Sequence, residues 1–182
     1  MTLSIYIQVP FCQTKCTYCN FHTGVVSPDR YEPYANAIRR EVETSGHGTG
    51  VLTPEGCDTP VGRSSVDFEG RGFNPAESRA FREGASAPEA NGTRPTVDTV
   101  YFGGGTPSLL DPAALHRILD TLRDSFDFDE APEITLEADP ETITSAKATA
   151  WLSAGFNRIS LGAQSFDDRE LQSAGRMHRR AD

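Results

Sequence analysis

The stretch "VPFCQTKCTYCNF", residues 9–21, places three cysteines within eight positions at the spacing C-x3-C-x2-C. A single loop with this spacing can wrap three thiolates around one thiophilic centre. Three protein ligands fit a four-iron cluster in which one iron stays open for a chelating substrate. We therefore interpret Cys12, Cys16 and Cys19 as the metal ligands of an iron-sulfur cluster.

A zinc site is the alternative interpretation of this loop, and it needs a fourth protein ligand. The candidates are His22, which lies only three residues after Cys19, and Cys57, which lies in a segment of loop-like composition. Neither position suits a fourth ligand, so we favour the cluster. Cys57 is then interpreted as an incidental thiol, and His22 as a solvated loop residue.

Strand-like and helix-like patterns alternate four times along the chain. The strand "SIYIQV" (4–9) leads into the cysteine loop, and a helix signal follows in which Ser27 is the expected N-cap and Pro28 fits the first turn. Such an alternation predicts an α/β fold with a parallel sheet and helical crossovers. The later units comprise strands 96–102, 133–138 and 158–164, with helices after Asp111, near 143–153 (ending at Gly155) and around 167–174.

Residues 45–96 differ from the rest of the chain in composition. They hold nine Gly and five Pro but only four Ile, Leu or Val, which is too little apolar surface to offset the entropy of ordering them. We expect a disordered insertion between a first β-α unit at 1–44 and further units of the same domain at 97–182. Four β-α units do not close a barrel, so we expect the N-terminal part of a longer protein.

The bulk composition limits the partners of this 182-residue chain. A formal charge of -9 disfavours binding to nucleic acid or to anionic lipid. No apolar run approaches the roughly 18 residues of a membrane span, and "MTLSIYIQVP" lacks the basic start of a signal peptide. We therefore expect a cytoplasmic protein, and in that reducing compartment clustered cysteines bind metals more often than they form disulfides.

Polar or flexible residues follow the predicted strands where each strand ends. The glycine run 103–105 follows the second strand and is either a tight turn or a close approach to a ligand. Glu137 and Gln164 would each be solvent-facing if taken alone, but the carboxyl ends of parallel strands meet on one rim. Arg176 is either part of a solvated basic run or a partner that pairs with a carboxylate through its planar fork. The predicted site therefore lies on this rim, together with the cysteine loop.

Four ordered motifs resemble radical S-adenosylmethionine (SAM) proteins of the oxygen-independent coproporphyrinogen III oxidase family. The resemblance covers nearly all of the chain except the insertion, and it is strongest to the HemW-like heme chaperone branch. Phe21 stands where the dehydrogenase branch typically carries a further cysteine, and the first strand begins without the N-terminal extension of that branch. The motifs are "YIQVPFCQTKCTYCNF", "YFGGGTPSLL", "EITLEADPETI" and "GFNRISLGAQSFDDRELQSAGRMH".

This resemblance implies an incomplete radical SAM partial (β/α)6 TIM-like barrel with a [4Fe-4S] cluster and SAM as cofactors. It implies that the cluster donates an electron for the reductive cleavage of SAM. Gln8 departs from the family's usual histidine, so a proton-transfer role at that position is in doubt. The implied SAM contacts are Tyr6, Gly104, Gly105, Thr106, Glu137, Gln164 and Arg176.

By the same resemblance, the expected function is that of a heme chaperone, which binds heme and transfers it to an acceptor protein. The alternative is an oxygen-independent coproporphyrinogen III oxidase or dehydrogenase of porphyrin biosynthesis, with a porphyrinogen as its substrate. None of the four histidines stands in a context that marks a heme ligand: His22, His47, His116 and His178.

Overall fold

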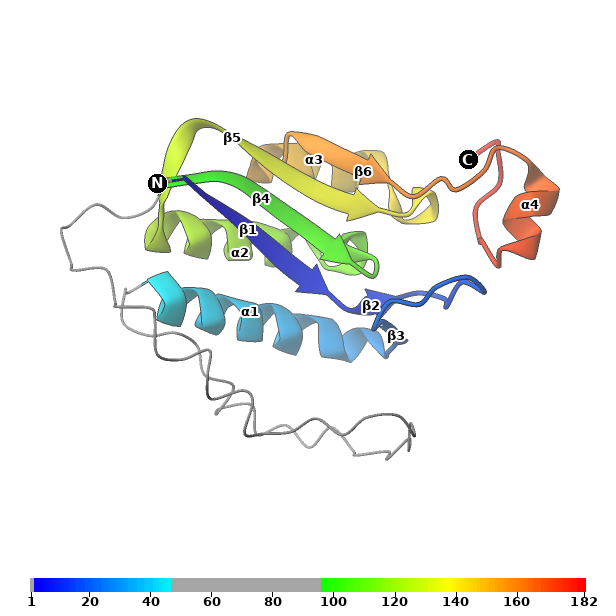
Figure 1. Cartoon of the computed structure of the whole chain (residues 1–182), viewed down its shortest axis with the longest axis horizontal. Coiled ribbons are helices and arrows are strands. Elements are labelled where there is room, and N and C mark those ends of the chain that lie inside the picture. Colours follow the sequence, from blue (N-terminus) through cyan, green and yellow to red (C-terminus); the bar gives the residue numbers. More distant parts are fainter. Residues whose placement is uncertain (1, 47–95) are drawn as a thin grey trace, which may run out of the picture. The chain divides into compact units, whose positions relative to one another are not determined.

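The computed structural model describes residues 2–46 and 96–182, which form an α/β unit (Figure 1). Its centre is a sheet of four parallel strands in the order β1-β4-β5-β6. The predicted parallel sheet is therefore confirmed, and within the described residues it does not close into a barrel. Its strands are β1 (Thr2–Val9), β4 (Thr96–Gly104), β5 (Asp127–Ala138) and β6 (Arg158–Leu161).

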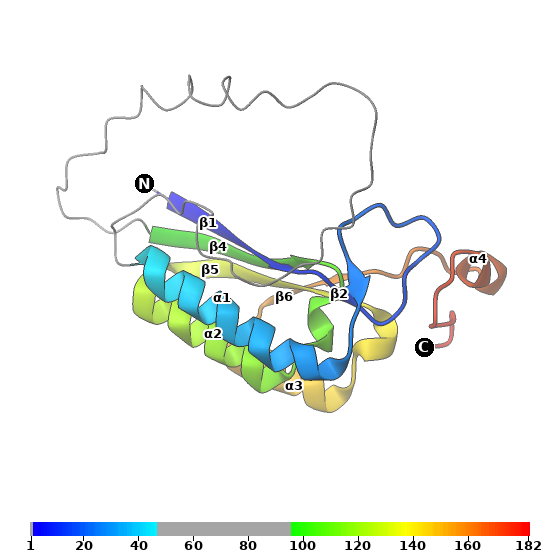
Figure 2. The same cartoon turned by 90° about the horizontal axis from the view of Figure 1, so that it is seen from below.

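Three helices cover one face of this sheet, as Figure 2 shows from a second direction. They are α1 (Tyr31–Gly46), α2 (Pro112–Ser125) and α3 (Ser145–Ala154). A short helix, α4 (Asp168–Ser173), lies beyond the end of β6. No helix among these described residues has the length and apolar character that crossing a membrane requires.

The core lies between the sheet and its helices, and strand alternation explains which side chains enter it. In β1, Ile7 and Val9 are buried, whereas Tyr6 and Gln8, which alternate with them, are exposed. Trp151 of α3 is 1% exposed and belongs to this core. In α2, apolar residues at helical spacing form a stripe that is fully buried at all four positions, Leu115, Ile118, Leu119 and Leu122.

Two helix boundaries follow the predicted signals, and one does not. The side chain of Asp111 accepts a hydrogen bond from Ala113 N at 2.8 Å and so caps α2. Gly155 ends α3 in the left-handed conformation, with φ of 104°. The prediction that Ser27 caps the first helix was wrong, because its side chain makes no capping hydrogen bond. A 3-10 turn at Pro28–Arg30 comes first, and α1 begins at Tyr31.

The ends of the strands also differ from prediction. The fourth strand was expected to reach residue 164, but β6 ends at Leu161, and Gln164 has a positive φ of 66° that extended backbone cannot adopt. A two-residue pair, β2 (Phe11–Cys12) with β3 (Gly24–Val25), was not predicted because two residues carry no period. The predicted insertion lies almost entirely outside the described residues, as does Cys57.

A candidate cofactor site at the carboxyl ends of the strands

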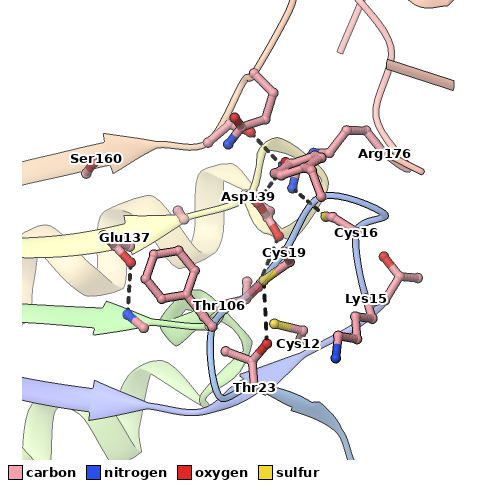
Figure 3. A pocket seen from close by; sticks show the side chains of 18 of the residues that line it. Cys12, Lys15, Cys16, Cys19, Thr23, Thr106, Glu137, Asp139, Ser160 and Arg176 are labelled. Carbon is pink, nitrogen blue, oxygen red and sulfur yellow. Dashed lines mark hydrogen bonds and ion pairs between the residues drawn. The ribbon is translucent and has the colours of Figure 1, made fainter. Parts of the chain in front are cut away.

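A cavity of about 320 Å³ opens where the four strands end, and the cysteine loop forms one wall (Figure 3). Cys12, Cys16 and Cys19 all line it, and all three are free and half-buried. Six of the seven residues predicted to contact SAM line the same cavity: Gly104, Gly105, Thr106, Glu137, Gln164 and Arg176. The rim predicted from the strand ends therefore gathers these residues around one space.

Tyr6 is the predicted contact that the structure does not place in the lining of this cavity. It lies on the sheet face opposite the helices, where its ring stacks on Tyr101 with centroids 5.8 Å apart. Tyr101 in turn donates a hydrogen bond to Glu137 Oε1 at 2.7 Å. Tyr6 thus reaches the lining through Tyr101.

Glu137 is fixed by two donors from β4. Tyr101 bonds one carboxylate oxygen, and Gly104 N donates to the other at 3.1 Å. The pKa of Tyr101 is raised, first by burial and then by its hydrogen bond to the Glu137 carboxylate. The pKa of Tyr6 is also raised, by burial and by the charge of Glu137. The carboxylate therefore stands in a fixed orientation at the cavity wall.

The glycine run joins β4 to the base of the cysteine loop. Gly105 N donates to Val9 O at 2.8 Å, and Thr106 N donates to Phe11 O at 2.6 Å. A Cβ at Gly105 would overlap the carbonyl of Phe11, so a side chain is excluded there. The run is a tight turn whose backbone lines the cavity, and its approach to a ligand stays a prediction.

Arg176 is buried, which excludes the solvated-run interpretation and confirms the pairing with a carboxylate. Its Nη2 donates to Asp139 Oδ1 at 2.5 Å and to Gly162 O at 2.6 Å. Its Nη1 lies 3.5 Å from Cys16 Sγ. Burial alone would lower the pKa of Arg176, but the hydrogen bonds to Asp139 and Cys16 outweigh it and raise that pKa. The guanidinium is therefore a permanent cation beside the cysteine loop.

His178, two residues after Arg176, is also buried, at 4% exposure. Its Nε2 lies 3.0 Å from Ala163 O, and its Nδ1 lies 3.4 Å from Glu141 Oε2. Of the other histidines, His22 is exposed as predicted. His116 pairs with Asp120 on the surface of α2, and His47 is outside the described residues.

Sequence reasoning missed Asp139 and Tyr101. Asp139 follows β5 directly and holds both Arg176 and Thr106, whose Oγ1 donates to Asp139 Oδ2 at 3.0 Å. Its signal was available in "EADP", where a second carboxylate stands two residues after Glu137 on the same rim. No sequence feature marked Tyr101 as a site residue, because aromatic residues are common inside strands.

The residues at this cavity fit a cluster and SAM. Within residues 2–46 and 96–182, no three His, Cys, Asp or Glu side chains converge closely enough to hold a single metal ion. Three free thiols on one loop nevertheless suit a cluster, whose ligands bind different irons. The guanidinium suits a carboxylate and Glu137 suits an ammonium or hydroxyl group. Arg176 Nε is buried without a hydrogen-bond partner among the described residues.

A three-thiol loop facing polar strand ends gives this α/β protein of parallel β-α units a candidate cofactor site. Residues 56–182 match the family described as the Radical SAM superfamily, and the chain belongs to that superfamily. The cysteine loop precedes the matched range.

Curated relatives extend the similarity over the cysteine loop. The heme chaperone HemW of Mycobacterium tuberculosis strain H37Rv is 33% identical over 180 residues, covering 96% of this chain and 34% of the relative. The oxygen-independent coproporphyrinogen III oxidase of Bradyrhizobium diazoefficiens is 30% identical over 165 residues, covering 90% of this chain and 27% of the relative. The chain therefore spans about a third of the length of these relatives.

A solved structure shares the fold. It is the coproporphyrinogen III oxidase HemN of Escherichia coli, a radical SAM enzyme, and it matches with a TM-score of 0.66 at 23% identity. The match covers 96% of this chain and 31% of that protein. This likeness confirms the predicted fold class, a part of a TIM-like radical SAM barrel.

Proposed function

We propose that this chain binds a [4Fe-4S] cluster through Cys12, Cys16 and Cys19 and binds SAM in the adjoining cavity. The observation that carries this proposal is the single cavity, which brings the three thiols together with the polar strand ends. Membership of the radical SAM superfamily supports it. The proposed SAM contacts in the lining are Gly104, Gly105, Thr106, Glu137, Gln164 and Arg176, with Tyr6 supporting Glu137 through Tyr101.

Each of these residues has a chemical role that follows from its surroundings. Arg176 supplies a permanent positive charge for the carboxylate of SAM. Glu137, held by Tyr101 and Gly104, supplies a fixed acceptor for an ammonium or hydroxyl group. The glycine run lets backbone approach the ligand. The cluster, when bound and reduced, supplies the electron for SAM cleavage.

For the whole protein we propose the role of a heme chaperone, which would bind heme and pass it to an acceptor protein in the cytoplasm. Relatives that are themselves heme chaperones support this proposal. Phe21, which is 72% exposed at the cavity lining, stands where the dehydrogenase branch typically has a cysteine. The second candidate is coproporphyrinogen III oxidation, favoured by the oxidase relative.

Anaerobic reconstitution with iron and sulfide, followed by electron paramagnetic resonance (EPR) of the dithionite-reduced chain, tests the cofactor proposal. We expect a [4Fe-4S]+ signal whose line shape changes when SAM is added, because one iron lacks a protein ligand. A cluster signal indifferent to SAM would contradict the SAM site. Absence of any cluster signal would contradict the role of the cysteines.

A pair of assays on the reconstituted full-length protein separates the two whole-protein functions. Heme titration followed by absorbance tests for binding, and anaerobic incubation with coproporphyrinogen III tests for decarboxylation. Heme binding without turnover supports the chaperone. Turnover of the porphyrinogen would overturn the chaperone proposal in favour of the oxidase.

A further inference from the structure

We propose that Asp139 is a positioning residue that orients Arg176 between the cysteine loop and the cofactor cavity. This inference rests on the proposed cluster and SAM site, and it assigns a role to a residue outside the predicted contacts. Asp139 acts through Arg176, so it need not touch either cofactor. Figure 3 shows Arg176 linked to both Asp139 and Cys16.

Both carboxylate oxygens of Asp139 are already engaged. Oδ1 accepts from Arg176 Nη2 at 2.5 Å, and Oδ2 accepts from Thr106 Oγ1 at 3.0 Å. Glu137, by contrast, accepts its hydrogen bonds from Tyr101 and Gly104, which both belong to β4. Asp139 is therefore the carboxylate that orients the guanidinium, and Glu137 is the one that faces the ligand.

The hydrogen bonds of Arg176 and Asp139 join segments that follow all four strands. Cys16 lies on the loop after β1, Thr106 follows β4, Asp139 follows β5 and Gly162 follows β6. Because the network is shared, a change at Asp139 alters where Arg176 places its charge relative to Cys16. The strand ends and the cysteine loop are thereby held in one arrangement.

Burial makes this arrangement hard to replace. The side chains of Arg176 and Asp139 are 6% and 21% exposed. Removing one partner of such a pair leaves the other charge buried without compensation. A Cβ at Gly162 would stand 3.0 Å from Asp139 Oδ1 and 3.5 Å from Arg176 Nη2, so there is little room for either group to shift.

A double-mutant cycle with Asp139→Asn and Arg176→Met tests whether Asp139 acts through Arg176. The affinity for SAM is measured by titrating the EPR line shape of the reduced, reconstituted chain. We expect Asp139→Asn to weaken SAM binding about tenfold, the scale of a lost charge-assisted hydrogen bond. In the Arg176→Met background, Asp139→Asn should cause no further loss. Additive losses would mean that Asp139 acts independently of Arg176, and would overturn the proposal.

The midpoint potential of the cluster is a second readout, which a purely structural role would not move. Asp139→Asn removes the counter-charge of the guanidinium beside Cys16, so the potential should rise. Asp139→Glu keeps the charge and should return the potential toward the wild-type value. Asp120→Asn is the matched control, because Asp120 pairs with Arg123 on the surface of α2 and should leave both readouts unchanged.

The outcomes separate this inference from the proposed function. A wild-type chain without a cluster signal, or with a signal indifferent to SAM, overturns both. A wild-type chain that responds to SAM, with an Asp139→Asn variant that responds equally, overturns only the role of Asp139. If circular dichroism shows that Asp139→Asn is unfolded, Gly162→Ala displaces the carboxylate without removing its charge. If Gly162→Ala binds SAM with wild-type affinity, the proposed role of Asp139 is likewise overturned.

Discussion

Arg176 and Cys16 are 160 positions apart in the sequence, yet Arg176 Nη1 donates to Cys16 Sγ at 3.5 Å. A second link joins the same two segments, because Thr17 N donates to Ala174 O at 3.4 Å. The segment after α4 therefore helps to fix the cysteine loop that follows β1. The candidate cofactor site consequently depends on contacts between segments near the two ends of the described residues.

Replacing any one of the three loop cysteines should abolish cluster assembly, because two thiolates cannot replace three at a four-iron cluster. We expect Cys12→Ser, Cys16→Ser and Cys19→Ser each to lose most of the iron and sulfide that the wild-type chain takes up. Chemical analysis of iron and sulfide after anaerobic reconstitution measures this. Cys57→Ser is the matched control and should retain full iron, and a Cys16→Ser variant that did the same would contradict the assignment.

The raised pKa of Tyr101 predicts a pH dependence at high pH. The folded chain keeps the phenol protonated above its ordinary pKa of 10.0, whereas the unfolded chain releases the proton there. The resulting stability is fully present below pH 10 and is lost as the pH rises toward the folded-state pKa. Glu137→Gln removes the carboxylate that helps to raise this pKa, so Tyr101 should titrate at lower pH.

Absorbance of the ionised phenol, followed against pH in the wild-type chain and in Glu137→Gln, measures that shift. Tyr101→Phe in each background identifies which titration step belongs to this residue. Equal Tyr101 pKa values in both backgrounds would mean that burial alone accounts for the shift.

The sheet and most helices could be predicted because their signals are local. The apolar stripe of α2, Asp111 at its start and Gly155 after α3 each act within a few residues. Parallel order then follows from the β-α alternation, and with it the rim on which Glu137 lies. The failure at Ser27 has a local cause too, because Pro28 begins a 3-10 turn instead of an α-helical one.

The contacts across the rim could not be predicted, because they depend on where strands of different lengths end. Nothing near Asp139 in the sequence indicates that its partner is 37 positions away. The contacts of His178 with Glu141 and with the Ala163 carbonyl likewise form only because the fold brings these groups close. Local sequence patterns therefore identified much of the cavity lining but missed the interactions that orient it.

Removing the cap of α2 should destabilise the fold. Asp111→Ala deprives Ala113 N of its acceptor, which should lower the free energy of unfolding by about 1 kcal/mol. Ser27→Ala, the matched control, should change it little, because the Ser27 side chain makes no capping bond. Urea denaturation followed by circular dichroism compares the two variants, and equal losses would contradict the assignment of the caps.

Gly105, which follows β4 and packs against the start of the cysteine loop, should tolerate no side chain. Its Cβ would overlap the Phe11 carbonyl, and because that neighbour is backbone, the strand end itself must move. We expect Gly105→Ala to lower the free energy of unfolding by about 2 kcal/mol, the scale of core overpacking. Gly24→Ala is the matched control, since no atom of the described residues, apart from its own chain neighbours, lies within 4 Å of a Cβ at that position. The midpoints of urea denaturation compare the stability of the two variants. Equal midpoints would show that the contact between Gly105 and Phe11 does not anchor the loop.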